Sequence, residues 1–178
     1  QLGSHISDLL DRGGIPYCKG GVMSRHARWC RSLSGWRKAV RRWVKHARPE
    51  DILNVDIFFD FVAVYGAQPL AKQLHQAISG RATRQGAFLK LLARNAANHG
   101  GGRTIFGGFK TENGRFHIKA NLLLPITETL RVLAISRGVT QTNSGDRAKA
   151  LIQHHHMPME VGQLGEDVAF ALRLLLRQ

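Results

Sequence analysis

Hydrophobic residues recur along most of this chain at spacings of three, four and seven, which is the pattern of amphipathic helices. Prolines stand at predicted helix starts, as at Pro69 and Pro125, and glycines follow predicted helix ends, as at Gly13 and Gly138. The pattern predicts helices over Ser7–Arg12, Ser24–His46, Pro69–Ile78, Gln85–Asn98, Pro125–Arg137 and Gln163–Arg177, with a further helix capped within Thr140–Ser144 and ending near His154.

The segment Leu53–Val64 has a different pattern, because two carboxylates interrupt an apolar run. In an extended strand, Asp56 and Asp60 share one face with other alternate residues, and the opposite face is entirely apolar. A helix with Ile52, Val55, Phe59 and Val62 on one stripe is the alternative, as is a strand whose acidic face is simply exposed. The strand hypothesis places the two carboxylates roughly 13 Å apart, so they could not both hold one metal pair.

A β-hairpin is predicted from Thr104–Phe109 and Arg115–Leu124. Asn113 and Gly114 lie between the two segments and suit the left-handed positions of a tight turn. The predicted fold class is therefore α+β and mostly α, a helical bundle-like domain with an inserted β-hairpin.

Charge is unevenly distributed in this chain of 178 residues, whose formal net charge is +14. No acidic residue occurs between Arg12 and Pro49, where ten lysines and arginines accumulate. Such a field attracts polyanions or nucleotide phosphates, unless an acidic neighbour neutralises it. A basic nucleic-acid or polyanion-binding module is therefore one candidate function.

Several functional classes lack their signatures in this sequence. It has no phosphate-binding G-x-x-x-x-G-K-[ST] loop, no H-E-x-x-H and no paired C-x-x-C, and Cys18, His26 and Cys30 do not have zinc-like spacing. No run of about eighteen apolar residues appears, and the first residues do not resemble a secretory signal. We expect a soluble, cytoplasmic protein.

A set of short motifs in a fixed order is more informative than any one of them. The set comprises Gly14–Met23, tryptophans at helical spacing from Trp29 to Trp43, Ile57–Phe61, Val64–Gly66, Phe106–Phe109, His117–Lys119, Leu124–Ile126 and Leu172–Gln178. Together they resemble the nucleotidyltransferase family of bacterial signal-transduction proteins, which is often joined to CBS or cyclic-nucleotide-binding domains and is related to the protein-PII uridylyltransferases.

The resemblance implies two domains. Residues 1–50 correspond to the tail of a DNA polymerase β-like nucleotidyltransferase domain, and residues 51–178 to a helical substrate-binding domain, with the strand over 53–65 assignable to either. The implied function is nucleotidyl or uridylyl transfer from an NTP to a protein or small-molecule acceptor, with the second domain binding the acceptor. A catalytic half, regulatory domains and a second copy of the chain are the implied partners.

The resemblance also implies a two-metal site in which a D-x-D pair and a third carboxylate bind Mg²⁺. Asp60 is the implied third carboxylate, catalytic and metal-binding, with Asp56 as its metal-binding alternative. Gly3-Ser4 is followed by Asp8 and Asp11 at the wrong spacing, so the D-x-D half is not in this sequence and we expect no activity from this chain alone.

Contacts to substrate phosphates or to the acceptor are expected from two groups of residues. The first group is Lys19, Gly20, Gly21 and Arg25, and the second is Lys119 and Arg131. The sequence departs from the family pattern at Val62, Ala63 and Ala67, which raises the alternative of an interaction domain whose transferase chemistry has lapsed.

Overall fold

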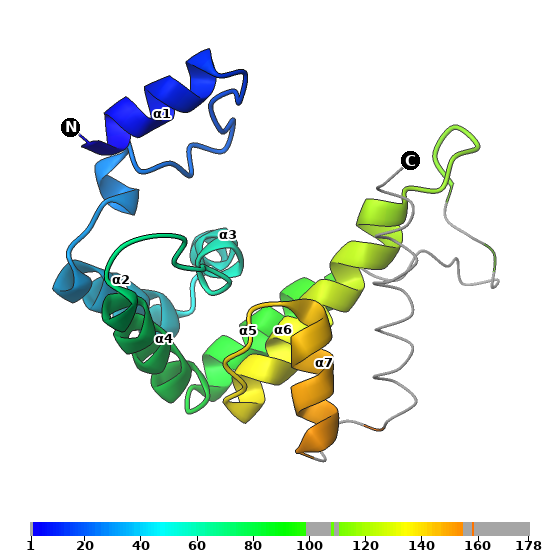
Figure 1. The fold of residues 1–178 in the computed structure, drawn as a ribbon. Helices are drawn as coiled ribbons and strands as arrows, with labels where there is room; N and C mark the ends of the chain where they lie inside the picture. Colours follow the sequence, from blue (N-terminus) through cyan, green and yellow to red (C-terminus); the bar gives the residue numbers. More distant parts are fainter. Residues whose placement is uncertain (1, 99–107, 109–110, 155–157, 159–178) are drawn as a thin grey trace. The chain divides into compact units, whose positions relative to one another are not determined.

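The computed structural model describes residues 2–98, 108, 111–154 and 158. The chain forms two compact units, Gln1–Ala39 and Val40–Gln178 (Figure 1). Within the described residues all regular structure is helical, and β pairing is limited to one antiparallel bridge between Glu112 and Arg115. The predicted α+β class is therefore wrong.

The first unit begins with α1 (Leu2–Arg12), which ends at Gly13 as predicted. The predicted helix over Ser24–His46 is interrupted, because a 3-10 turn, η1 (Ala27–Trp29), precedes α2 (Leu33–His46). Ser32 explains the new start, since its Oγ accepts a hydrogen bond of 3.1 Å from the Gly35 backbone N–H. Helix α2 therefore begins later than its hydrophobic periodicity indicates.

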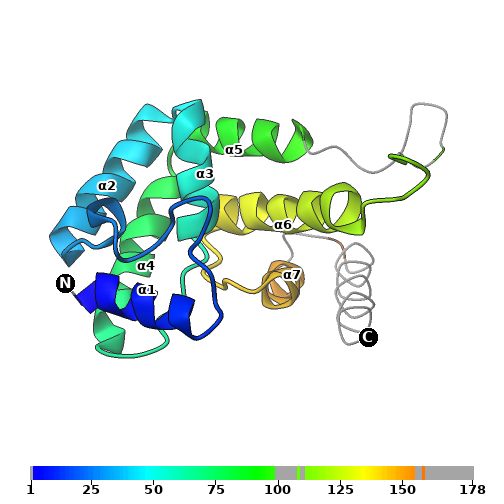
Figure 2. The same cartoon turned by 90° about the horizontal axis from the view of Figure 1, so that it is seen from above.

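The second unit contains the end of α2 and the five helices α3 (Pro49–Phe58), α4 (Gln68–Ala82), α5 (Gly86–Asn98), α6 (Leu124–Arg137) and α7 (Ser144–Gln153). Helix α6 lies between α5 and α7 and packs against both (Figure 2). Leu130 of α6 meets Ala148 and Leu151 of α7 in a buried cluster. The central position of α6 makes it the element around which this unit is organised.

The predicted strand over Leu53–Val64 is a helix for its first half. Pro49 opens α3 at its first turn, with Glu50 and Asp51 beside the positive end of the helix dipole. Ile52 and Val55 are buried on the same stripe as Phe59, in agreement with the helical alternative, whereas Val62 lies beyond the helix and is exposed. Asp56 is thus on α3 and Asp60 lies in the turn that follows it, and neither is on a strand.

The predicted hairpin is correct only at its turn. Asn113 and Gly114 have left-handed backbone angles, with φ of 51° and 74°, and Glu112 and Arg115 exchange two backbone hydrogen bonds across them. The second predicted strand, Arg115–Leu124, instead contains a π-helical turn, η2 (Lys119–Leu123), that leads directly into α6. The first, Thr104–Phe109, lies outside the described residues except for Gly108. An Asn-Gly turn forms locally, so it does not by itself require long paired strands.

The connection between α6 and α7 is fixed at both ends, as the sequence predicts. Gly138 adopts a left-handed conformation with φ of 72°, and the next backbone N–H, of Val139, donates to Ala134 O at 2.9 Å. Asn143 caps α7 by accepting hydrogen bonds from the N–H groups of Gly145 and Asp146. Residues 139–143 therefore form a defined loop.

One predicted helix is not described, and the described helices are too short or too polar to cross a membrane. The predicted helix over Gln163–Arg177 lies outside the described residues. Within the part of the chain that is described, no helix combines the length and the apolarity needed to cross a membrane.

Candidate functional site

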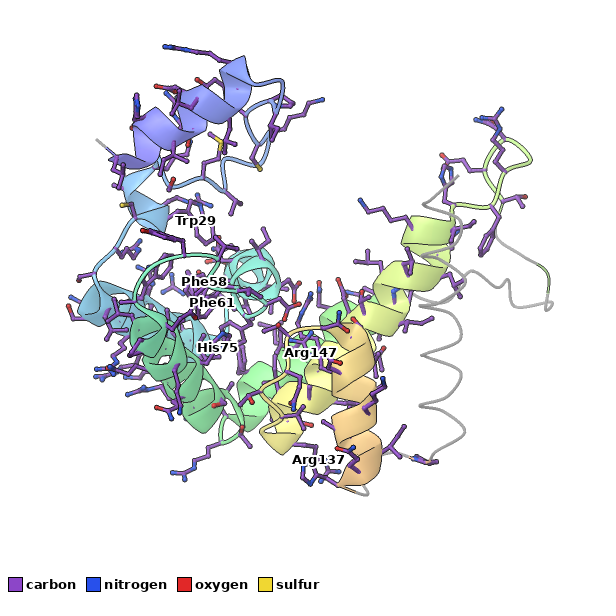
Figure 3. All side chains as sticks on the ribbon, viewed as in Figure 1. Trp29, Phe58, Phe61, His75, Arg137 and Arg147 are labelled. Atoms are coloured by element: carbon purple, nitrogen blue, oxygen red, sulfur yellow. The ribbon has the colours of Figure 1, made fainter. Side chains whose placement is uncertain are left out.

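The three phenylalanines of the segment Phe58–Phe61 pack against different aromatic rings. Phe58 contacts Trp43 edge to face and stacks on Phe61, with ring centroids 5.6 and 5.3 Å apart. Phe59 points into the core against Phe88 at 6.0 Å, and Phe61 stacks on His75 of α4 at 4.0 Å. Figure 3 shows Phe58, Phe61 and His75 gathered together. The aromatic contacts on both sides fix the position of Asp60.

Asp60 is the centre of an ion-pair network between three parts of the second unit. Arg131 of α6 donates to Asp60 Oδ2 from Nε at 3.0 Å and from Nη2 at 2.8 Å. Arg147 of α7 donates to Oδ2 from Nη1 at 3.2 Å and to Oδ1 from Nη2. The carboxylate therefore joins the segment after α3 to both α6 and α7.

Asp56 extends this network by one helical turn. Its Oδ1 accepts from Nη1 of Arg131 at 3.2 Å, and its Oδ2 accepts from Nδ2 of Asn95 on α5 at 3.3 Å. Arg131 is thus shared by the two carboxylates. We call Asp56, Asp60, Asn95, Arg131 and Arg147 the Asp60 network.

The pKa values of the two aspartates are shifted in opposite directions. Burial raises the pKa of Asp60, but hydrogen bonds from Arg147 and Arg131 and their positive charges outweigh it, so that its pKa lies below the usual value. Burial also raises the pKa of Asp56, and the nearby Glu128 adds to this effect, so that the lowering by Arg131 is not sufficient and the net pKa is raised. Asp60 is the carboxylate held firmly in its ionised form.

The donor set around these carboxylates does not fit a Mg²⁺ ion. Both oxygens of Asp60 and one of Asp56 accept hydrogen bonds from guanidinium groups, whose charge repels a cation, whereas Mg²⁺ requires oxygen ligands in near-octahedral geometry. Among the described residues, no group of three or more His, Cys, Asp or Glu side chains could hold a metal. The Mg²⁺-binding and catalytic roles implied for Asp60 and Asp56 stay predictions, and the arrangement gives these residues a structural role.

The other predicted contact residues are divided between the two units. Arg25 forms an ion pair of 3.3 Å with Asp8 of α1 and lies over the Tyr17 ring, while Lys19 is exposed in the adjacent turn. That turn contains Gly20 and Gly21, where Gly21 N donates to Cys18 O at 2.9 Å with φ of 66°. In the second unit, Lys119 is exposed in η2, and Arg131 belongs to the Asp60 network. Of the predicted site residues, the structure brings together Asp56, Asp60 and Arg131.

Arg147 and Asn95 are the members of the network that the sequence analysis missed. The side chain of Arg147 is only 4% exposed, although arginine is rarely buried without a partner. Its position one helical turn before the buried Leu151 is the signal that could have identified it as an inward-facing cation. Asn95 gives no comparable signal.

An open groove with a volume of about 950 Å³ lies beside the Asp60 network. One wall is the 61–63 loop, the second is the start of α4 with Lys72 and His75, and the third is the loop 140–142 with Asp146 of α7. We call it the α4 groove. It is within the size range of ligand-binding clefts, and none of its polar lining residues was predicted as a site residue.

The Asp60 network determines the positions of two walls of the α4 groove. Asp60 directly precedes the 61–63 loop, and Arg147 donates from Nε to the backbone oxygen of Gln141 at 2.8 Å in the facing loop. Gln68 also donates from Nε2 to Ala63 O at 3.3 Å, which joins the 61–63 loop to α4. The ion pairs therefore hold the groove open in a fixed shape.

Breaking the network at Asp60 should destabilise the second unit. We expect Asp60→Asn to lower the free energy of unfolding by about 3 kcal/mol, because it leaves the buried Arg147 without its carboxylate partner. Urea denaturation followed by circular dichroism measures this change. The matched control is Glu50→Gln, which removes an exposed ion pair with Arg48 and should cost less than about 1 kcal/mol. Equal losses in the two variants would contradict the structural role.

The same carboxylate should govern the stability of the second unit in acid. Because the pKa of Asp60 is lower in the folded chain than in the unfolded chain, its contribution is present above the unfolded pKa and disappears as the pH falls through the folded pKa. The pKa of Asp56 is raised in the folded chain, so protonation of Asp56 at low pH favours the folded chain and opposes the effect of Asp60. We expect the stability difference between the original chain and Asp60→Asn to shrink as denaturation is repeated at decreasing pH. A difference that stays constant down to strong acid would disprove this linkage.

Comparison with protein families identifies the domain that contains α5, α6 and α7. Residues 86–178 match the family described as "Putative nucleotidyltransferase substrate binding domain", and residues 1–50 match the family described as "Putative nucleotidyltransferase DUF294". Searches among curated proteins and among solved structures returned no match. The first match alone covers more than half of the chain, and both matches agree with the order of motifs in the sequence. The chain therefore belongs to the family of nucleotidyltransferases in which a substrate-binding domain follows the nucleotidyltransferase domain.

Proposed function

We propose that this chain is the acceptor-binding part of a Mg²⁺-dependent nucleotidyltransferase and that the α4 groove receives the acceptor. The full enzyme transfers a nucleotidyl or uridylyl group from an NTP to this acceptor in signal transduction. The family match supports the transferase class, and the groove is the observation that carries the assignment of acceptor binding to the second unit.

The side chains that line the groove are suited to orienting an acceptor rather than to stabilising charge on the transferred phosphate. Its described lining includes amide and hydroxyl groups from Gln68, Gln141 and Thr142, which orient a ligand through hydrogen bonds. Mg²⁺ supplies charge stabilisation on the transferred phosphate in this class of reaction, and carboxylates of a D-x-D segment would bind it. The contribution of this chain is to place an acceptor group at a fixed distance from that chemistry, which accelerates transfer by orientation.

Contacts in the first unit favour a second candidate function, the binding of nucleic acid. Arginines lie over aromatic rings at three places there, with guanidinium-to-centroid distances of 4.6, 5.2 and 5.7 Å for Arg25 on Tyr17, Arg28 on Trp29 and Arg31 on Trp36. Alternation of cations and aromatic rings is typical of single-strand binding surfaces. The sequence pattern alone does not reveal these pairings. This function would give RNA affinity that falls steeply with salt.

The transferase proposal is tested with a longer chain that includes the upstream D-x-D segment. Incubation with radiolabelled UTP or ATP, Mg²⁺ and a soluble cell extract should yield a labelled acceptor, and changing the D-x-D aspartates to asparagine should abolish labelling. Lys72→Ala combined with Gln141→Ala should reduce labelling several-fold, because both residues line the groove, while NTP hydrolysis in the absence of extract stays unchanged.

One result would contradict the transferase function, and another would contradict only the assignment of acceptor binding to the α4 groove. One is the absence of labelled product with either nucleotide, which together with salt-sensitive RNA binding would favour the second candidate. The other is full labelling by the groove variant, which would separate acceptor binding from the α4 groove. A matched control is Lys90→Ala, which changes an exposed lysine on α5 that does not line the groove.

A further inference from the structure

The charges of the α4 groove differ from those of the chain as a whole. The chain has a net charge of +14, yet the described lining of the groove contains one lysine, one aspartate and no arginine. Lys72 belongs to α4 and Asp146 to α7, so the two charges come from different walls, and both side chains are exposed. A groove for nucleic acid or for a triphosphate would concentrate cations instead. The groove is suited to a ligand that carries both signs of charge.

Two stacked rings contribute to the lining of the groove. The Phe61 and His75 rings are stacked with an interplanar angle of 8°, and both line the groove. Figure 3 shows the two side chains close together. Burial lowers the pKa of His75, although the Phe61 backbone and the Asp60 charge oppose this shift, so the imidazole is neutral at pH 7. The Phe61 and His75 rings therefore add no charge to those of Lys72 and Asp146.

The segment that leads from the 61–63 loop into α4 carries several exposed apolar residues. Val62 lines the groove and is 66% exposed, and the chain continues through Val64 and Tyr65, which are 94% and 96% exposed, to Leu70 on the first turn of α4. Contiguous exposed apolar residues, with an aromatic residue among them, mark protein interaction sites. These exposed residues, which continue the chain from the groove wall, favour a ligand larger than a small molecule.

The polar groups of the 140–142 loop match a polypeptide backbone. Thr140, Gln141 and Thr142 form a short stretch of hydrogen-bonding side chains in a loop held by Arg147. Neutral amides and hydroxyls bond peptide N–H and C=O groups without requiring charge. Each wall of the groove thus supplies a different part of a peptide-binding surface.

We propose that the α4 groove binds a segment of a partner protein in which an acidic residue and a basic residue flank an apolar stretch. The acidic residue pairs with Lys72, the basic residue pairs with Asp146, and the apolar stretch covers Phe61 and Val62. This inference rests on the proposed function, because it makes the acceptor of nucleotidyl transfer a polypeptide.

Selection from a phage-displayed random heptapeptide library tests the proposal on the present chain. Panning should enrich peptides with one acidic and one basic residue around apolar residues. A fluorescent copy of an enriched peptide should lose about tenfold in affinity on Lys72→Glu and on Asp146→Lys, because each change places like charges together. Lys90→Glu, which makes the same charge change on α5 outside the groove, should leave binding intact.

The outcomes separate this proposal from the one on which it rests. No enrichment by a chain whose circular dichroism shows it to be folded would overturn the peptide proposal, and so would enriched peptides that bind both groove variants unchanged. RNA binding that depends on Lys72 would overturn it in favour of a polyanion ligand. If the longer chain still labels an acceptor in these cases, the transferase function stands and only the class of acceptor is wrong.

Discussion

The second unit depends on the pairing of one carboxylate with two arginines. Asp60 follows α3, Arg131 and Arg147 come from α6 and α7, and these residues are far apart in the sequence. Taking such charges out of water is costly, and only complete pairing with good geometry offsets that cost. Removing one member therefore leaves an unpaired buried charge and destabilises the fold. The intact network specifies which helices pair and contributes little net stability of its own.

This link connects the fold to the proposed function. The groove walls are loops, which would otherwise be among the least constrained parts of a helical protein. Asp60 and the stacked ring of Phe61 fix one loop, and Arg147 fixes the other through the Gln141 backbone. A binding surface made of loops can position an acceptor only if those loops are held in this way.

Local patterns predicted the helices better than they predicted the site. Proline, glycine and capping signals placed α4, α6 and α7 close to their observed positions, because these residues act within one turn of the chain. The Leu53–Val64 segment was assigned to a strand with a helix as the alternative, because short apolar runs with acidic residues satisfy both periodicities. The structure agrees with the helix as far as Phe58. The sequence singled out Asp56, Asp60 and Arg131, but their mutual pairing and the role of Arg147 arise from tertiary contacts that no local pattern records.

The central claim is that Asp60 acts through its arginine partners, and a double-mutant cycle tests it most directly. The free energies of unfolding would be measured for the original chain, Asp60→Asn, Arg147→Met and the double variant. Our account predicts a coupling energy above about 1 kcal/mol, with the double variant more stable than the sum of the single losses implies. Additive losses within about 0.5 kcal/mol would show that the two side chains act independently and would contradict the account.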